Sequence, residues 1–475
     1  MIGLEVHAQL LTRTKLFCAC ETSFGDTPNA HTCPVCLGLP GALPVPNRRA
    51  VELAVVASLA LGASIEKTSV FARKNYFYAD LPKGYQISQF ELPLARHGTL
   101  EVETKDGTRV ARVLRVHMEE DAGKSLHDRG AGSAIDLNRA GTPLIEIVGE
   151  PDLRSAEEAS DYLRKLREIL MACGVCDGNL EQGSFRCDAN VSVRPRGEGA
   201  LGVRTELKNI NSFRFVEEAI DFEIRRQIAL IEAGGRVKMA TRGYNSEKKE
   251  TYLLREKETD ADYRYFPDPD LPPLVLSDAF IETLASSAPE LPRAKRERYV
   301  AELGLTPYAA QVLTAHPKIA AFFDGAVRLS AENARGADPL KLGNFIQAEV
   351  LRDVTTSGLD AAIPLEVSQL VELIELVHAG KISGKQAKDV YASMRGTTRS
   401  PAEIVAASGT SVLADPVELE RIAREIVLAN AKQAASFKAG KTALFGYFVG
   451  QLMKATKGRA DPVVANEVLR KVLAE

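Results

Sequence analysis

The alternation of polarity in residues 3–10 constrains the fold of this chain more than any other feature. Apolar residues at every second position alternate with Glu5, His7 and Gln9. Because successive side chains of a β-strand point to opposite faces, the stretch predicts a half-buried strand with one polar face. A carboxylate and an imidazole on that face can converge on a metal ion or a phosphate. The simpler alternative is the solvated face of an antiparallel sheet.

Two later stretches repeat this arrangement. Residues 185–193 place Arg186, Asp188 and Asn190 on one strand face, and residues 203–208 align Glu206 with Lys208. Strands that each load one face with carboxylates and cations favour one shared site on a largely antiparallel sheet. We therefore expect an α+β fold in which this sheet forms a cradle with flanking amphipathic helices.

Two further stretches add carboxylates to the predicted site. Residues 115–121 end in an acidic cluster that contains Glu120, and Glu146 lies within the apolar run 143–148. An ionised carboxylate inside an apolar strand is costly unless it is paired or bound to a metal. Glu146 therefore needs a partner, and a structural ion pair would satisfy it as well as a metal ion would.

Four of the seven cysteines form two close-spaced pairs. These are Cys18, Cys20, Cys33 and Cys36, and turn-forming residues separate the two pairs. Four thiolates at this spacing predict a closed, tetrahedral structural zinc site, a zinc knuckle, and the alternative is four free thiols. The remaining cysteines, Cys173, Cys176 and Cys187, lack a fourth ligand, and we expect Cys187 to pack as a small hydrophobe.

The loop at residues 73–89 is rich in aromatic residues and contains Lys83 next to a glycine. Glycine lets the backbone approach a ligand closely, and a lysine can meet a phosphate as a point charge. A surface loop packed over aromatic side chains is an equally good interpretation. Because loops often carry function, Lys83 remains a candidate.

The composition changes at about Pro292, where helical periodicity replaces strand alternation. We expect a cradle domain over residues 1–291, a helical domain over 292–398 and a helical tail over 399–475. Asp415-Pro416 and Asp461-Pro462 are typical helix starts. The tail is locally basic, which suits a phosphate backbone, although such a run more commonly forms a solvated face.

The overall charge and the missing motifs narrow the function. A net charge of −3 argues against a uniformly basic surface, so any contact with nucleic acid is expected to be local. No apolar run approaches the roughly 20 residues of a membrane span, and no targeting pattern is visible, so we expect a cytoplasmic protein. Two fragments that imitate a P-loop lack its first glycine. ATP, if bound, is expected to meet the strand-borne acids and bases and a divalent ion.

Several long motifs resemble one family. They are GLEVH at 3–7, CAC at 18–20, CPVCLGLPG at 33–41, NYFYADLPKGYQ at 75–86, DLNRAG at 136–141, RCDANVS at 186–192 and GQLMKATKG at 450–458. Together they resemble the GatB/GatE family, the B subunits of the aspartyl/glutamyl-tRNA(Asn/Gln) amidotransferase GatCAB. The resemblance covers the whole chain, and the last part resembles that family's YqeY-like tail.

The resemblance implies a function. The family's B subunit uses ATP and Mg²⁺ to phosphorylate the side-chain carboxylate of misacylated Glu-tRNA(Gln) or Asp-tRNA(Asn). Ammonia that the A subunit releases from glutamine then displaces the phosphate and gives Gln-tRNA(Gln) or Asn-tRNA(Asn). The protein is thus expected to be the kinase subunit of a glutamine-hydrolysing carbon–nitrogen ligase, in a heterotrimer with A and C subunits.

The resemblance also implies site residues. It gives catalytic roles to Glu5, His7, Glu120 and Glu146, of which His7, Glu120 and Glu146 would bind Mg²⁺. It places Lys83, Arg186, Asp188, Asn190, Glu206 and Lys208 near the nucleotide and the acyl end. It matches Cys18, Cys20, Cys33 and Cys36 to a structural zinc knuckle. It suggests that the tail binds tRNA, with Lys438, Lys441, Lys454, Lys457 and Arg459 as contacts.

Two alternatives remain open. A non-catalytic tRNA-binding adaptor would use the zinc knuckle and the basic tail for affinity, with structural acidic strands. A free-standing ligase of carboxylates and amines would not need the tail. Glu146 discriminates against the adaptor, because an adaptor has no reason to place a carboxylate inside an apolar strand.

Overall fold

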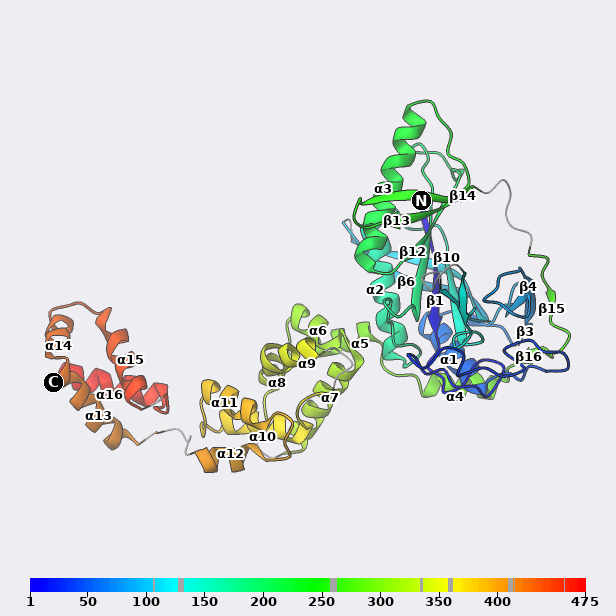
Figure 1. Cartoon of the computed structure of the whole chain (residues 1–475). Helices are drawn as coiled ribbons and strands as arrows, with labels where there is room; N and C mark the ends of the chain where they lie inside the picture. Colours follow the sequence, from blue (N-terminus) through cyan, green and yellow to red (C-terminus); the bar gives the residue numbers. More distant parts are fainter. Residues whose placement is uncertain are drawn as a thin grey trace. The chain divides into compact units, whose positions relative to one another are not determined.

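The computed structural model describes residues 1–105, 107–126, 132–256, 263–333, 336–357, 362–408, 413, 415–456 and 458–475. The chain divides into two compact units, Met1–Pro292 and Arg293–Glu475. The first combines sheets with helices and the second is helical (Figure 1). The mixed α+β class predicted from the sequence is therefore confirmed. Among the described residues, no helix has the length and apolar character needed to cross a membrane.

The first unit is organised around a sheet with nine described strands in the order β14-β13-β12-β11-β1-β10-β7-β6-β2. Their bounds are β1 Ile2–Gln9, β2 Ser64–Ile65, β6 Ala95–Thr104, β7 Gly107–Glu120, β10 Pro143–Gly149, β11 Phe185–Val191, β12 Thr205–Ile210, β13 Ala240–Asn245 and β14 Glu250–Glu256. Neighbouring strands are antiparallel except for the parallel pair β12 and β13. The first stretch of the chain, β1, thus becomes a central strand.

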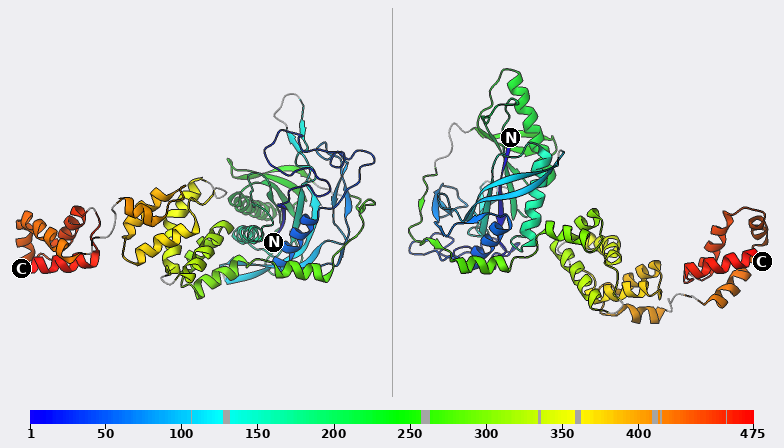
Figure 2. Two further views of the ribbon diagram at one scale, coloured as in Figure 1. Left: turned by 90° about the horizontal axis from the view of Figure 1, so that it is seen from below. Right: turned by 180° about the vertical axis from the view of Figure 1, so that it is seen from behind.

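One face of the sheet packs against helices. Leu4, Val6 and Ala8 of β1 are buried in a core shared with α1 (Arg48–Ala60), α2 (Ala156–Ala172) and α3 (Phe213–Glu232). Helices α2 and α3 pack side by side, α2 against β6 and α3 against β11 and β12 (Figure 2). The alternation predicted for residues 3–10 is confirmed, and it directs Glu5, His7 and Gln9 to the opposite face.

Serine residues cap the starts of the flanking helices α2 and α3. Ser155 and Ser212 cap α2 and α3, each accepting a hydrogen bond from a backbone N–H of the first turn. The apolar face of α3 is buried only in its first part. Ile228 and Ile231 near its end are 41% and 46% exposed, and Figure 1 shows the end of this helix beyond strands β13 and β14.

The alternation of strand β7 changes phase in its middle. Ala111 and Val113 face the core in its first half, and Val116 and Met118 do so in its second half. The pairing with β10 shifts at this point, since Val148 lies opposite Arg115 whereas the next residue of β10 lies opposite Val113. Such a β-bulge inserts one residue and re-aims the side chains that follow. As a result, odd-numbered residues after the bulge face away from the core.

Small sheets complete the first unit. Strands β4 (Ala72–Asn75), β5 (Tyr85–Ser88) and β15 (Phe266–Pro267) form one, β8 (Lys124–Leu126) and β9 (Ala134–Asp136) a second, and β3 (Thr68–Ser69) and β16 (Leu274–Val275) a third. Helix α4 covers Asp278–Ser286. Strand β5 packs against the end of β7, where Ile87 N–H donates to Glu120 Oε1 and Met118 N–H donates to Gln89 Oε1.

The second unit contains two hydrophobic clusters. The first involves α5 Pro292–Ala301, α6 Pro307–Thr314, α7 Pro317–Glu332, α8 Pro339–Phe345, the π-helical turn η1 Ile346–Val350, α9 Leu351–Ser357, α10 Val367–His378, α11 Gly384–Met394 and α12 Pro401–Ser408. The second involves α13 Pro416–Ala429, α14 Ala431–Lys438, α15 Leu444–Ala455 and α16 Pro462–Ala474. The domain boundary near residue 398 stays a prediction.

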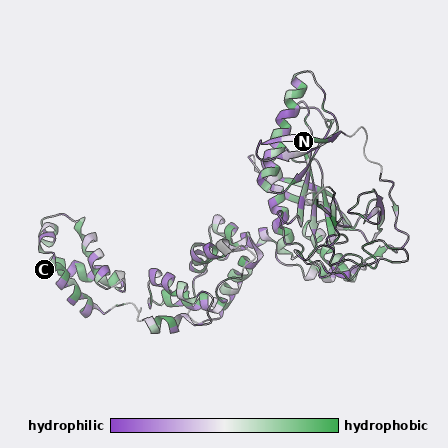
Figure 3. Cartoon of the chain, in the orientation of Figure 1, coloured by the Kyte–Doolittle hydropathy of each residue, from purple (hydrophilic) through white to green (hydrophobic). Residues whose placement is uncertain are grey.

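Helices α13 and α16 start as predicted. Asp415 accepts a hydrogen bond from Val417 N–H, and Asp461 accepts from Val463 and Val464 N–H. Figure 3 shows polar and apolar residues interleaved along these helices. Their apolar residues, among them Leu419, meet in the second cluster. Amphipathic packing therefore accounts for the helical periodicity of the tail.

Candidate functional site

The centre of the candidate site is an imidazole between two carboxylates. His7 Nε2 on β1 lies 3.4 Å from Glu146 Oε2 on β10 and 3.5 Å from Glu119 Oε1 on β7. His117 Nε2 approaches the same Glu146 oxygen at 3.2 Å. One ligand atom from each of His7, Glu119 and Glu146 lies within 4.8 Å of the others. We call this group the His7 centre.

Strand pairing builds the His7 centre. Glu146 lies directly opposite His7 on one side and His117 on the other. Because the bulge in β7 turns odd-numbered residues to this face, Glu119 follows His117 into the centre. Glu120, predicted as a ligand from the family resemblance, points to the other side of β7. Its Oε1 accepts hydrogen bonds from Lys83 Nζ and from Ile87 N–H.

The sequence contained a signal for Glu119 that the resemblance obscured. Val116 and Met118 are the apolar members of the second half of β7, so the residues between and after them share the polar face. Reading this alternation on its own selects Glu119 rather than Glu120 as the neighbour of His7. In the structure, Glu120 contacts Lys83 and Ile87 and does not join Glu146 in the His7 centre.

The charges of the His7 centre stabilise one another. Burial opposes ionisation of Glu146, but His117 and His7 outweigh it and hold the pKa of this carboxyl well below its usual range. Burial would also lower the pKa of His7, but the Glu146 carboxylate outweighs it and raises this pKa to about 9. A histidine and two carboxylates so arranged can hold a proton or a divalent cation.

A second group of polar residues lies one row further along the sheet. Glu5, Asp188 and Glu206 each offer a carboxylate oxygen within 4.8 Å of the others. Lys208 Nζ donates to Asp188 and lies 3.2 Å from Glu206 Oε1, and Asn190 Nδ2 donates to Glu5 Oε1 at 2.9 Å. Burial, with help from Glu146 and Asp188, raises the pKa of Glu5. The strands therefore bring these five predicted residues together.

Arg186, the remaining predicted residue of the main sheet, lies at the other end of this face. Arg186 Nη2 donates to Asp121 Oδ1 at 3.0 Å, and Gln9 Nε2 donates to Asp121 Oδ2 at 2.9 Å. Lys83 bonds to Glu120, outside the His7 centre. Each predicted cation of the site is thus engaged by a carboxylate of the chain itself.

Lys74 on β4 is a cation that the sequence analysis missed. Burial opposes its charge, but Glu119 and other acidic groups nearby outweigh this and raise its pKa. Its Nζ lies 5.0 Å from the centroid of the Tyr263 ring. The available signal was its place in the aromatic stretch that drew attention to Lys83.

A groove of about 800 Å³ opens at the Gln9 end of β1. It is lined by loop residues that include Arg13, Phe24 and Asp177. None of the residues predicted for the site lines it. The groove therefore provides no further evidence for the His7 centre.

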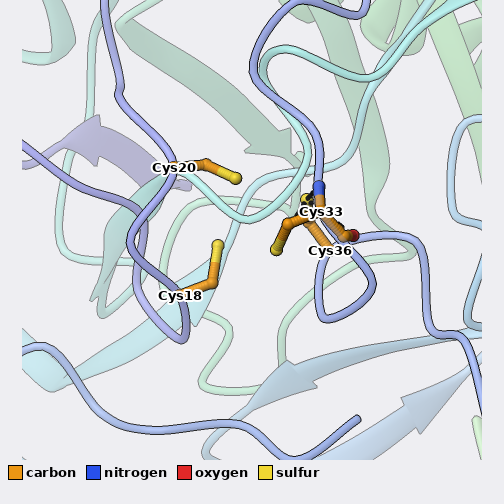
Figure 4. Close-up of side chains that lie close together, drawn as sticks. All are labelled: Cys18, Cys20, Cys33 and Cys36. Carbon is orange, nitrogen blue, oxygen red and sulfur yellow. Dashed lines mark hydrogen bonds between the residues drawn. The ribbon is translucent and has the colours of Figure 1, made fainter.

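The four clustered cysteines converge as the sequence predicts. The Sγ atoms of Cys18, Cys20, Cys33 and Cys36 lie within 4.8 Å of one another. Figure 4 shows the first pair facing the second from a separate loop segment. Four soft sulfur donors at this separation fit a tetrahedral zinc ion. Cys187 lies elsewhere, 3% exposed in the core, so its prediction as a small hydrophobe is confirmed.

The basic residues predicted to contact tRNA lie mostly on the surface of the tail. Lys438 ends α14, Lys441 follows it and Lys454 belongs to α15, and all three are exposed. Arg459 is half-buried, and its Nε donates to the Thr456 carbonyl. Lys457 lies outside the described residues.

Fold and site together define a class. The chain is a mixed α+β protein with a candidate divalent-cation centre on the face of its main sheet opposite helices α2 and α3, a four-cysteine cluster that can hold a metal, and a helical C-terminal part.

Comparisons with known proteins identify the family. The model of the GatB/GatE catalytic domain matches residues 1–282, and that of the GatB domain matches residues 329–473. The chain is 52% identical over 478 residues to the B subunit of the aspartyl/glutamyl-tRNA(Asn/Gln) amidotransferase from Geobacter sulfurreducens, covering all of this chain and 98% of the relative. The proteins of the same name from Myxococcus xanthus and Thermodesulfovibrio yellowstonii are 49% and 50% identical, over all of this chain and 98% and 99% of theirs. The chain belongs to the GatB/GatE family, as the sequence motifs predicted.

Proposed function

We propose that this chain activates the side-chain carboxylate of misacylated Glu-tRNA(Gln), Asp-tRNA(Asn) or both by transferring the γ-phosphoryl group of ATP to it. Ammonia from glutamine then replaces the phosphate. The chain would work in the cytoplasm as the B subunit of a heterotrimeric carbon–nitrogen ligase with A and C subunits. The names of the relatives supply the substrates and the subunit role.

The His7 centre is the observation that carries this proposal. His7, Glu119 and Glu146 supply one nitrogen and carboxylate oxygens close enough for one divalent cation. We infer that these three residues, with Glu119 in place of Glu120, hold Mg²⁺. Bound there, the ion would neutralise charge on the transferred phosphoryl group. The ionised state of Glu146 favours a cation, because a protonated carboxyl is a poor ligand.

The polar face around the centre suits a reaction without an enzyme nucleophile. The substrate carboxylate attacks the γ-phosphorus atom, and ADP leaves. Lys208 lies between Asp188 and Glu206, and we propose that it exchanges one of these carboxylates for a phosphate oxygen of the nucleotide. Asn190 orients Glu5, so this carboxylate keeps a fixed position next to Glu146. Lys83 and Arg186 are proposed to help at the borders of the site.

The other parts of the chain are proposed to support this reaction. Zinc bound to the four cysteines would fix the loops that follow β1 without taking part in the chemistry, since four thiolates leave no open position. The exposed lysines of the tail, Lys438, Lys441 and Lys454, would contact the phosphate backbone of the tRNA.

The test is transfer of labelled γ-phosphate from ATP in the assembled heterotrimer with Mg²⁺ and Glu-tRNA(Gln), without glutamine. We expect Glu146→Gln to abolish transfer while tRNA affinity stays unchanged. Glu150→Gln, a substitution just beyond the end of the same strand, is the matched control and should retain transfer. Transfer that persists in a folded E146Q variant would exclude this centre. If the wild type shows no transfer but binds tRNA, the adaptor alternative would be favoured.

A further inference from the structure

Arg115 lies on the same face of β7 as the His7 centre. It follows the bulge and is separated from His117 by Val116, whose side chain is buried in the core. Residues two apart on a strand share a face and lie about 7 Å apart. Its cross-strand neighbour Val148 in turn lies opposite Glu5. Arg115 therefore lies one position along β7 from the His7 centre and in the same cross-strand row as Glu5.

Arg115 lacks the partners that other arginines of β7 have. Its Nε is buried without a hydrogen-bond partner, and its guanidinium has no hydrogen bond or ion pair within the described part of the chain. By contrast, Arg112 bonds to both carboxylate oxygens of Asp152 at 2.7 and 2.8 Å. An unpaired guanidinium with a buried nitrogen costs free energy unless something outside the chain completes it.

A second unpaired nitrogen lies next to it. His117 is 3% exposed, and its Nε2 contacts Glu146, but its buried Nδ1 atom has no hydrogen-bond partner among the residues that the structure describes. Two unsatisfied nitrogens at adjacent positions of one strand face indicate that a polar group from outside the chain belongs there. A planar guanidinium fits a phosphate group best, because two N–H groups can bind two of its oxygens.

We propose that Arg115 binds a phosphate group next to the His7 centre. This assignment rests on the proposed function and deepens it. Arg115 would give the polyphosphate chain of the nucleotide a cation that is not paired with a carboxylate of the described chain. A backbone phosphate of the tRNA has the same chemistry, and separate binding measurements distinguish the two sources.

The experiment compares Arg115→Gln with Arg115→Lys in the full heterotrimer. Arg96→Gln is the matched control, because Arg96 lies directly opposite on β6 but is bonded to the Glu91 carbonyl and lies 3.6 Å from Glu66. Calorimetry measures the affinity for a non-hydrolysable ATP analogue and for inorganic tripolyphosphate, and filter binding measures the affinity for aminoacyl-tRNA. No turnover is needed, so this measurement stays informative whatever the phosphoryl-transfer assay gives.

We expect R115Q to weaken binding of both polyphosphates about 10- to 100-fold, the effect of losing a charge-assisted hydrogen-bonding residue. R115K should lose less, and R96Q should bind as the wild type does. Because no protein acceptor loses its partner, the thermal midpoint of R115Q should not fall.

A loss confined to tRNA binding would overturn the nucleotide as the source of the phosphate and would assign an RNA phosphate instead. Unchanged affinity for polyphosphate and tRNA would overturn the phosphate site. If R115Q loses affinity for polyphosphate while E146Q still transfers phosphate, the phosphate site is retained and the proposed metal centre is rejected.

Discussion

Glu146 on β10 lies directly opposite His117 on β7, and its Oε2 atom is 3.2 Å from Nε2 of that ring. The same oxygen lies 3.4 Å from His7 Nε2 on the neighbouring strand β1. Two imidazoles thus hold a carboxylate that the sequence places inside an apolar strand. An ionised carboxylate inside an apolar strand needs a partner, and the two imidazoles supply it.

Glu119 and Glu120 should differ in their effect on metal binding. We expect Glu119→Gln to weaken Mn²⁺ binding to the full chain by at least about tenfold, because it removes a donor from the centre. Glu120→Gln should leave Mn²⁺ affinity unchanged, because its carboxylate contacts Lys83 and Ile87 instead. Titration of free Mn²⁺ by electron paramagnetic resonance measures both. Equal losses in the two variants would contradict this placement of the two carboxylates.

Metal affinity should depend on the protonation of His7. The pKa of His7 is raised to about 9, so the ring carries a proton at neutral pH when no metal is bound. A metal must displace that proton, because only the neutral ring coordinates. Affinity is therefore expected to rise about tenfold per pH unit from pH 7 to 9 and then to level off.

Calorimetry in buffers of different ionisation enthalpy counts the released proton directly. His97→Gln is the control, because His97 is exposed and lies outside the metal-binding groups found among the described residues. That variant should keep the wild-type pH dependence. Affinity that is constant between pH 7 and 9 in the wild type would argue against a protonated His7.

The four-cysteine cluster should determine zinc content and local stability. Cys36→Ser is expected to lose zinc and to lower the thermal midpoint, since binding free energy at a structural site contributes to folding. Cys173→Ser, a half-buried cysteine outside the cluster, is the matched control and should keep one zinc per chain. Elemental analysis and thermal melts with and without chelator provide the readouts. Equal zinc content in both variants would refute the assignment.

Glu223 should determine acid stability rather than activity. This α3 carboxylate is 0% exposed and accepts hydrogen bonds from Arg226, Gln227 and Thr251. Burial opposes its charge, but Arg226 and Gln227 outweigh it and lower its pKa. The carboxylate therefore stabilises the fold fully above about pH 4.5, the pKa expected in the unfolded chain, and this stabilisation disappears as pH falls through the lower folded pKa.

Substitution separates Glu223 from an ordinary surface acid. Glu223→Gln is expected to lower the free energy of unfolding at pH 7 by about 3 kcal/mol, because two partly exposed arginines lose their shared anion. Asp221→Asn, which breaks an exposed pair with Arg225 on the same helix, should change it by less than about 1 kcal/mol. Urea unfolding at pH 7 and pH 4 provides the measurement, and similar values for the two variants would contradict the buried network.

The sequence alone determined the features that depend on local periodicity and on donor chemistry. The alternation around Leu4, Val6 and Ala8 fixed which face of β1 is buried, because a strand has only two faces. The spacing of the four cysteines also predicted their convergence, because two close-spaced cysteine pairs are the usual donors of a structural zinc site. The motifs identified the family.

Tertiary structure decided which residues meet at the site. Local alternation separates the faces of Glu119 and Glu120, but the meeting of Glu119 with His7 and of Glu146 with His117 depends on which strands are neighbours. The unpaired state of Arg115 is likewise visible only when every possible partner has been placed. Periodicity is a local property that the chain encodes residue by residue. Strand order and register instead arise from the packing of the whole sheet, in which a one-residue shift moves a side chain to the opposite face.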